Sequence, residues 1–261
     1  MKKSDIIILH YINNAKLKGY KMNSYENKAL EEMLQWKRKM QEEPSSMGIV
    51  SKAVQNKISS LMPERAQKAI TDVIKNMVKL VITGSVLTTS IEKGSGSLEQ
   101  RENIVRKNIK AFKSTAVISG AGTGAGGFVI GMADFPILLS LKLKFLFQTA
   151  NAYGFNIHSY KERLYILHIF ELAFSSDKKR LEVFDKIANW DSYAKTLPEN
   201  MEAFDWRSFQ QEYRDYIDLA KMLQLVPIIG APVGAIANYR LMEKLGYTAM
   251  NAYRMRIFKP L

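Results

Sequence analysis

The chain has 261 residues, enough to build a substantial core as one large helical domain or one domain with an appendage, which excludes global disorder. Its 38 lysines and arginines outnumber its 25 acids, and the formal charge of +13 favours anionic partners such as phospholipid headgroups, nucleic acid or an acidic protein surface. The absence of cysteine excludes disulfides and thiolate metal sites.

The amino terminus predicts a cytoplasmic protein that begins with a helical arm. Asp5 interrupts the basic start, the apolar run at 6–9 is short and no small-residue cleavage site follows, so we expect no secretory signal. Helical periodicity at 25–40 ends at a breaker in the sequence Glu-Pro-Ser-Ser. This pattern predicts an N-terminal helical arm over 1–45 and a main helical domain over 46–261.

Helix-period patterns dominate the main domain and sustained alternation is hard to find, so we expect an all-α fold. Pro63 fits the first turn of a helix whose apolar positions recur at helical spacing over the following turns. Residues 92–97 are typical of a flexible connection, and another amphipathic helix begins at Ile104. Further along, Ser159 and Glu162 have the spacing of a capping box that starts the next helix.

Two uncharged stretches, 114–133 and 222–239, are rich in glycine, and the first holds six of the fifteen glycines. The first is long enough to cross a bilayer but poor in large apolar residues, so insertion and burial in a soluble helical domain both stay open. Glycines four residues apart let helices approach closely. We predict a multi-helix bundle around a glycine-rich central helical hairpin. The packing pairs are Gly122 with Gly126, Gly127 with Gly131, and Gly230 with Gly234.

Catalytic and cofactor motifs find little support. Gly122, Gly124 and Gly127 have a dinucleotide-binding spacing, but a helical pattern precedes them and Lys142 stands where that fold needs an acid. The three histidines lack a recognised metal pattern, and no nucleophile motif is present. We therefore expect no cofactor, no metal, no nucleic-acid partner and a non-catalytic role. A hydrolase that uses Asp134 is the alternative.

Asp134 closes the first uncharged stretch and must be hydrated, paired or protonated, because an isolated buried charge is costly. We expect it to pair with Arg240, Arg254 or Arg256. Such a pair would tie the two uncharged stretches together.

Residues 132–150 combine an apolar side that includes Phe145 with two lysines, Lys142 and Lys144, which can reach outward to phosphate. This mixture predicts contact with an anionic membrane surface or lipid, and salt should weaken that contact. A core helix with solvated lysines is the alternative.

Several landmarks resemble the EcsC protein family by their order over about residues 60–261. They are Gly131-Met132-Ala133-Asp134-Phe135-Pro136, Tyr153-Gly154-Phe155, Pro227-Ile228-Ile229-Gly230-Ala231-Pro232-Val233-Gly234 with Asn238, and Ala249 with Arg254-Met255-Arg256. The resemblance implies a bacterial protein whose family is named after a gene beside those of an ABC exporter, and it carries over no catalytic residues. From their places in the motifs we predict an important polar cluster. Its candidates are Asp134, Asn238, Arg240, Arg254 and Arg256.

Together these observations predict a non-catalytic, all-α protein attached peripherally to the inner face of the cell membrane. The resemblance implies an accessory role for an ABC exporter, whose subunits would be partners. The glycine pairs are compatible with a homo-oligomer. A soluble helical domain that binds a lipid or small amphiphile is the first alternative, and the hydrolase is the second.

Overall fold

The computed structural model describes residues 21–42, 64–84, 94–122, 127–176, 179–217 and 231–258. Over these ranges the regular secondary structure is helical, and the extended backbone pairs only in an isolated antiparallel bridge between Ser175 and Ile217. The all-α class predicted from periodicity is therefore confirmed. The helices are α2 (Ser24–Gln41), α4 (Glu64–Thr83), α5 (Leu98–Gly122), α6 (Gly127–Ala152), α7 (Tyr160–Phe174), α8 (Arg180–Ala188), α9 (Trp190–Thr196), the 3₁₀ turn η1 (Met201–Ala203), α10 (Trp206–Tyr216) and α12 (Ala231–Phe258).

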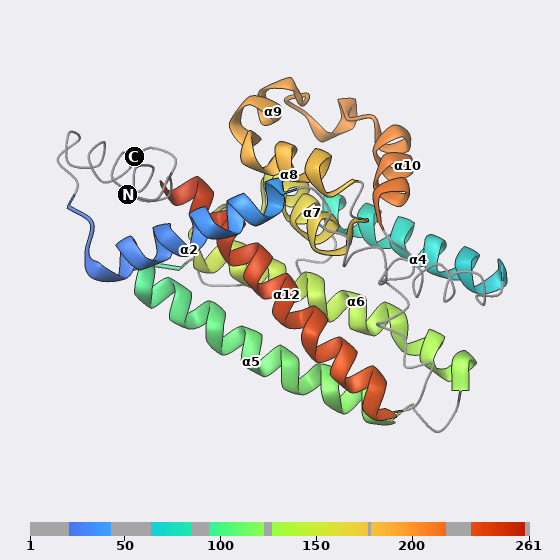
Figure 1. Ribbon diagram of the computed structural model, residues 1–261. Coiled ribbons are helices and arrows are strands. Elements are labelled where there is room, and N and C mark those ends of the chain that lie inside the picture. The colour runs from blue at the N-terminus through green and yellow to red at the C-terminus, as the bar shows by residue number, and fades with distance from the viewer. Residues whose placement is uncertain are drawn as a thin grey trace.

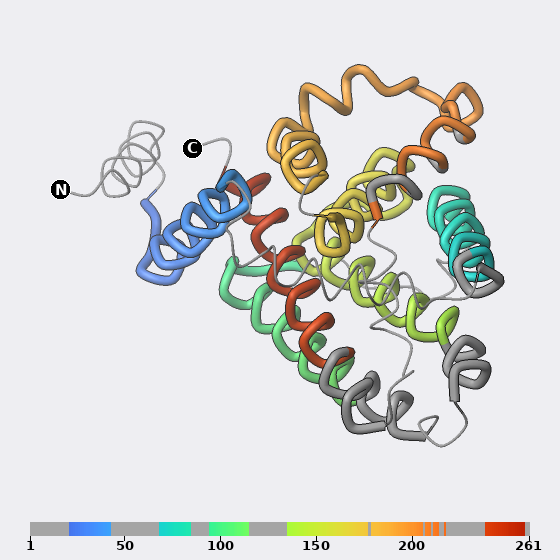
Figure 2. The backbone as a smooth tube through the Cα atoms, turned by 45° about the vertical axis from the view of Figure 1, so that its right-hand side comes forward, coloured from blue at the N-terminus to red at the C-terminus, as the bar shows by residue number. Residues whose placement is uncertain are grey.

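Three long helices, α5, α6 and α12, lie side by side in one layer, and α7 to α10 gather on the other side (Figure 1). Helices α5 and α12 run antiparallel, because Glu102 pairs with Arg254 near one end and Lys113 pairs with Glu243 further along. Helix α4 packs against α6, α7 and α10 at the edge of the molecule, well away from α2 (Figure 2).

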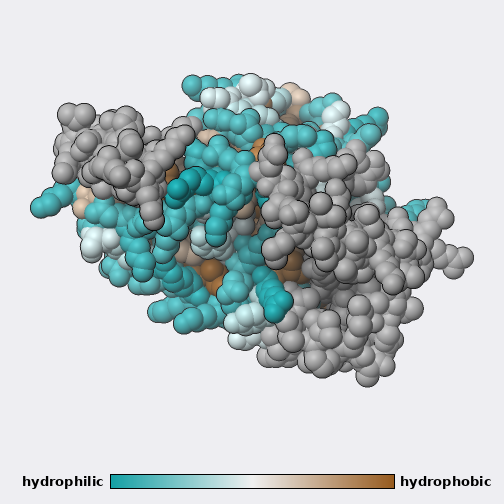
Figure 3. Space-filling view, in the orientation of Figure 1, coloured by the Kyte–Doolittle hydropathy of each residue, from teal (hydrophilic) through white to brown (hydrophobic). Residues whose placement is uncertain are grey.

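Helix α7 lies at the centre of the core. Every residue from Glu162 to Phe174 is buried, as expected of a helix that neighbours surround. The face of the molecule in Figure 3 is mostly hydrophilic over the described residues, with small hydrophobic areas between polar side chains. On this face, polar side chains thus cover much of the described apolar core.

The glycine-rich hairpin stays a prediction, although α5 and α6, which carry part of the first uncharged stretch, contact each other. Gly122 ends α5, Gly127 and Gly131 lie in α6, and Gly234 lies in α12. Gly126 and Gly230 fall outside the described residues. The packing role of these glycines stays a prediction, because the structure does not describe what surrounds them.

The described part of the predicted N-terminal arm, residues 21–42, packs on the same core as the other described helices. Helix α2 begins with a capping box formed by Asn23 and Glu26, which periodicity analysis missed. Its buried Leu30, Met33 and Trp36 belong to the central hydrophobic cluster, and the helix packs on α12, α8 and α5. The predicted boundary at residue 45 lies outside the described residues, so the division into two domains stays a prediction.

The predicted capping box at the start of α7 is wrong. Ser159 occupies the N-cap position, but its side chain makes no capping hydrogen bond. The Glu162 carboxylate instead accepts hydrogen bonds from Tyr253 and Arg256. A hydrogen bond from a guanidinium to a carboxylate is stronger than a neutral capping bond, which explains why Glu162 faces the interior.

Gly94 anchors the chain before α5 to the end of α6. Its N–H donates to the Asn151 carbonyl at 2.8 Å, and a Cβ at this position would lie 2.0 Å from the Ala152 carbonyl oxygen. We expect Gly94→Ala to destabilise the protein by about 1–3 kcal/mol, because a helix backbone cannot give way cheaply. Urea unfolding measures the change. Ser95→Ala, at an exposed neighbour, is the control, and equal midpoints for the two variants would contradict the prediction.

Candidate functional site

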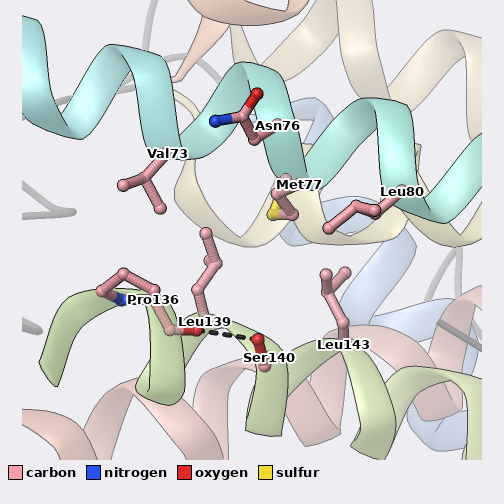
Figure 4. A pocket seen from close by; sticks show the side chains of 8 residues that line it. All are labelled: Val73, Asn76, Met77, Leu80, Pro136, Leu139, Ser140 and Leu143. Atoms are coloured by element: carbon pink, nitrogen blue, oxygen red, sulfur yellow. Dashed lines mark hydrogen bonds between the residues drawn. The ribbon is translucent and has the colours of Figure 1, made fainter. Parts of the chain in front are cut away.

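A groove between α4 and α6 is the candidate functional site. Val73, Met77 and Leu80 repeat at helical spacing on α4 and face Leu139 and Leu143 on α6 (Figure 4). The groove encloses about 230 Å³, and we call it the α4–α6 groove. Its complete lining is Val73, Asn76, Met77, Leu80, Pro136, Leu139, Ser140 and Leu143.

The wall of the α4–α6 groove offers few polar groups to a ligand. The Ser140 hydroxyl donates to the Pro136 carbonyl one turn earlier at 2.8 Å, so its hydrogen bond is already made within α6. Asn76 is exposed at the groove's outer side. What the groove presents is therefore mainly aliphatic surface, which suits an apolar group.

Exposed apolar and basic side chains border this groove. Leu80 is 49% exposed and Ile137 is 56% exposed, the two highest values among the large hydrophobic residues that the structure describes. Lys79 and Lys144 are exposed; Lys79 immediately precedes Leu80 and Lys144 immediately follows Leu143, and these two leucines stand at the same end of the groove in Figure 4. No carboxylate among the described residues pairs with either lysine. This edge of the molecule thus joins aliphatic surface to unneutralised positive charge.

Two of the three residues expected to contact lipid are buried. Lys142 is only 2% exposed, and its Nζ donates to Asn238 Oδ1 on α12 at 3.3 Å, so the expected outward direction of this side chain is wrong. Phe145 is fully buried and packs edge-on against Phe112 with ring centroids 5.8 Å apart. Lys144 alone of the three faces solvent.

Lys142 has an unusual electrostatic environment. Burial lowers its pKa to about 7, and the described residues supply no carboxylate to offset the loss of water. Its described hydrogen-bond partner is the neutral amide of Asn238. The cause is position: α6 is packed against α4, α5, α7 and α12, so few of its faces reach solvent.

Arg254 forms the most buried ion pair in the described residues. Its Nε and Nη2 donate to the two oxygens of Glu102, both at 2.7 Å, and its Nη1 donates to Glu32 at 2.8 Å. Tyr153 and Tyr25 also donate to the Glu102 carboxylate. Burial opposes ionisation of Glu102, but the hydrogen bonds and charge of Arg254 outweigh it and hold the pKa of this carboxyl below its usual value. These bonds fasten α2, α5 and the end of α6 to α12.

A second ion pair lies two residues further along α12. Arg256 Nη1 donates to Glu162 on α7 at 2.6 Å, and the guanidinium stacks 3.8 Å from the centroid of Phe155. Tyr253 donates to the other oxygen of Glu162 at 2.9 Å. Burial raises the pKa of Glu162, and the charge of Arg256 offsets part of that effect. The pair holds the end of α12 on the central helix.

The five candidates for a polar cluster do not form one site. Asn238 and Arg254 are separated by 16 residues of continuous helix, roughly 24 Å at about 1.5 Å per residue. Arg240 is exposed, and Arg254 and Arg256 have the glutamate partners described above. The backbone of Asp134 lies in α6, but its side chain is outside the described part of the structure. Its expected tie to an arginine, and its catalytic alternative, stay predictions.

A histidine and a glutamate three residues apart in sequence form a buried pair within α7. His168 Nδ1 lies 2.8 Å from Glu171 Oε2 within α7, and burial raises the pKa of Glu171. The rings of Trp190, Tyr193 and Phe209 surround the imidazole, and Nε2 has no hydrogen-bond partner within the described residues. The described residues contain no group of three or more side chains able to hold a metal ion.

None of the described helices combines the length and the apolar character needed to cross a membrane. A model of the EcsC protein family matches residues 27–258 of the chain. This protein belongs to the EcsC family. The family match reaches further toward the amino terminus than the landmarks near residue 60, because it includes most of α2.

Two relatives from Bacillus subtilis (strain 168) support this membership. Protein EcsC is 41% identical over 231 residues, which cover 88% of this chain and 95% of the relative. The uncharacterized protein YdbA is 30% identical over 143 residues, which cover 55% of this chain and 53% of that protein. No solved structure matches the chain.

Proposed function

We propose that this EcsC-family protein is a non-catalytic, peripheral membrane protein that binds an anionic lipid surface through the edge formed by α4 and α6. One observation carries the proposal: Leu80 and Ile137 are exposed at opposite ends of the α4–α6 groove, and Lys79 and Lys144, which adjoin its Leu80 end in sequence, have no carboxylate partner among the described residues. Aliphatic groups can enter the boundary between headgroups and acyl chains while lysines remain with the phosphates. The overall charge of +13 adds a longer-range attraction to the same surface.

The proposed site of action is the inner face of the cell membrane, beside an ABC exporter. This part of the proposal rests on the EcsC resemblance, whose name comes from a gene next to exporter genes. A peripheral protein at that surface would meet exporter subunits without inserting a helix of its own. Copurification with the exporter from detergent-solubilised membranes, followed by loss in high salt, would support the accessory role.

Charge removal at the groove edge tests the membrane proposal. We expect the double variant Lys79→Gln/Lys144→Gln to bind anionic vesicles about thirty-fold more weakly at low salt, because each lysine near the surface contributes about 1 kcal/mol. Sedimentation with phosphatidylglycerol vesicles measures the change. The unmodified protein should not bind phosphatidylcholine vesicles. A high-salt wash should release it from phosphatidylglycerol vesicles.

The matched control removes the same charge from another face. Lys107 and Lys110 are exposed on α5 and have no described carboxylate partner. Lys107→Gln/Lys110→Gln should therefore retain most of the vesicle affinity. Equal losses in the two double variants would show that total charge, and not the α4–α6 edge, determines binding. Absence of vesicle binding by the unmodified protein would remove the proposal itself.

A further inference from the structure

We infer that the α4–α6 groove binds one alkyl chain of an anionic phospholipid, with the phosphate held at the end near Lys79 and Lys144. The inference rests on the proposed membrane attachment and adds the ligand and its binding site, which we call the alkyl seat. Five of the groove's eight lining residues are valine, methionine or leucine, and a proline is a sixth apolar residue. Transfer of each methylene from water to such a surface contributes about 0.8 kcal/mol.

The dimensions of the groove favour a narrow ligand. Its lining extends from Val73 to Leu80 on α4 and from Pro136 to Leu143 on α6, roughly 10 Å at about 1.5 Å per helical residue. A cavity of about 150 Å³ can hold a benzene molecule, and this groove encloses about 230 Å³. It can therefore take a stretch of alkyl chain.

A protein partner fits this groove less well than a lipid chain. A stable protein interface covers about 800 Å² on each partner, and a helix seated in a groove needs anchors over several turns. The α4–α6 groove presents about two turns from each helix. The same limit applies to a second copy of this chain, so the groove alone does not account for a dimer.

The charges beside the groove define which end receives the head of the lipid. Leu80 and Leu143 stand together at one end in Figure 4, and Lys79 and Lys144 are their sequence neighbours. Neither lysine has a described carboxylate partner, so both ammonium groups can form charge-assisted hydrogen bonds to phosphate. At the opposite end, the sequence neighbours of Val73 and Pro136 include no lysine or arginine.

A groove-filling variant tests the alkyl seat with a soluble probe. Ser140→Trp places an indole in the mouth of the groove and removes only the hydroxyl bond to the Pro136 carbonyl. Calorimetry with dodecyl phosphate, kept below its micelle concentration, should show one bound molecule for the unmodified protein and at least ten-fold weaker binding for Ser140→Trp. Binding should carry a negative heat-capacity change, because apolar surface is buried. Inorganic phosphate should compete poorly.

The chain offers a closely matched control. Ser114 on α5 is also exposed and donates to a carbonyl one turn earlier, that of Lys110, at 3.1 Å. Ser114→Trp should bind dodecyl phosphate within two-fold of the unmodified protein. If Ser140→Trp keeps native helical content and binds the probe as well as this control, the alkyl seat is overturned. Competition by inorganic phosphate at equal concentration would also overturn it, because the head alone would then account for binding.

Two further arms separate failure of the seat from failure of membrane attachment. In one outcome, the unmodified protein sediments with vesicles while Ser140→Trp binds dodecyl phosphate as tightly as the unmodified protein does. This result would support membrane attachment and reject the groove as the binding site for the alkyl chain. If the protein binds dodecyl phosphate but no vesicles, the alkyl chain in the groove does not come from a membrane lipid. If Ser140→Trp does not fold, a photoreactive diazirine on an alkyl phosphate decides instead: adducts within 73–80 or 136–143 support the seat, and adducts confined to other segments reject it.

Discussion

Replacing Lys142 with methionine is expected to stabilise the protein by about 2–4 kcal/mol at pH 7. Burial lowers the pKa of Lys142 from 10.5 to about 7, and at about 1.4 kcal/mol per pH unit this difference corresponds to roughly 5 kcal/mol of lost stability. Methionine has a similar length and carries no charge. The gain is smaller than the full penalty, because Asn238 loses the hydrogen bond from Nζ.

The stabilisation should shrink as the pH rises. The folded protein releases the Lys142 proton near pH 7, whereas the unfolded chain keeps it up to about pH 10.5. Between these values the unfolded state binds more protons, so the stability of the unmodified protein increases with pH, and below pH 7 the penalty is fully present. The methionine variant lacks this dependence.

Urea unfolding at pH 6.5, 8 and 9.5 checks both the size and the pH dependence. Lys144→Met is the control, since Lys144 lies on the same helix but is exposed. Its stability relative to the unmodified protein should stay within about 0.5 kcal/mol at all three pH values. A Lys142→Met advantage that does not change with pH would show that the lysine is not desolvated as described.

The helices could be predicted from the sequence where their apolar residues face a single core. On α4, Ile70, Ile74, Met77 and Val81 are all buried, as their spacing indicates. The start of α5 was placed too late at Ile104. Helix α5 begins at Leu98, after Ser97 and Gln100 exchange side-chain and backbone hydrogen bonds as a capping box. That signal was present in the sequence, beside glycines that favoured a flexible connection.

The side-chain partners could not be predicted, because they depend on how distant helices meet. Glu102 and Arg254 are 152 residues apart, and no local pattern joins them. The sequence made Asp134 the expected partner of the arginines, whereas the described partners are Glu102, Glu32 and Glu162. Burial of Lys142 was missed for the same reason: helical spacing shows which residues share a face, but not that several helices enclose α6.

Glu102→Gln is expected to destabilise the protein by about 3–5 kcal/mol. The substitution keeps the shape of the side chain but leaves the guanidinium of Arg254, which is 1% exposed, with Glu32 as its one remaining carboxylate partner among the described residues. Removal of one member of a buried ion pair costs this much because the other charge remains in a poorly solvated interior. Glu32 is partly exposed and contacts a single guanidinium nitrogen, so it replaces little of the lost interaction.

The double variant Glu102→Gln/Arg254→Met separates the cost of an orphaned charge from the net contribution of the pair. With both charges gone, the protein should recover a large part of the stability lost in Glu102→Gln, since a buried pair and an apolar replacement are often similar in energy. Urea unfolding of the two single variants and the double variant gives the coupling energy. Near-additive losses would mean that Glu102 and Arg254 act separately.

The pH dependence provides an independent test of the same ion pair. The pKa of Glu102 is lower in the folded protein than in the unfolded chain, so its contribution is fully present above the unfolded value of about 4.5 and is lost as the pH falls through the folded value. The stability gap between the unmodified protein and Glu102→Gln should therefore narrow in acid. Glu99→Gln, at an exposed position of α5, should show neither the large loss at pH 7 nor the narrowing. If the gap stays constant down to pH 3, a group other than the Glu102 carboxylate holds Arg254.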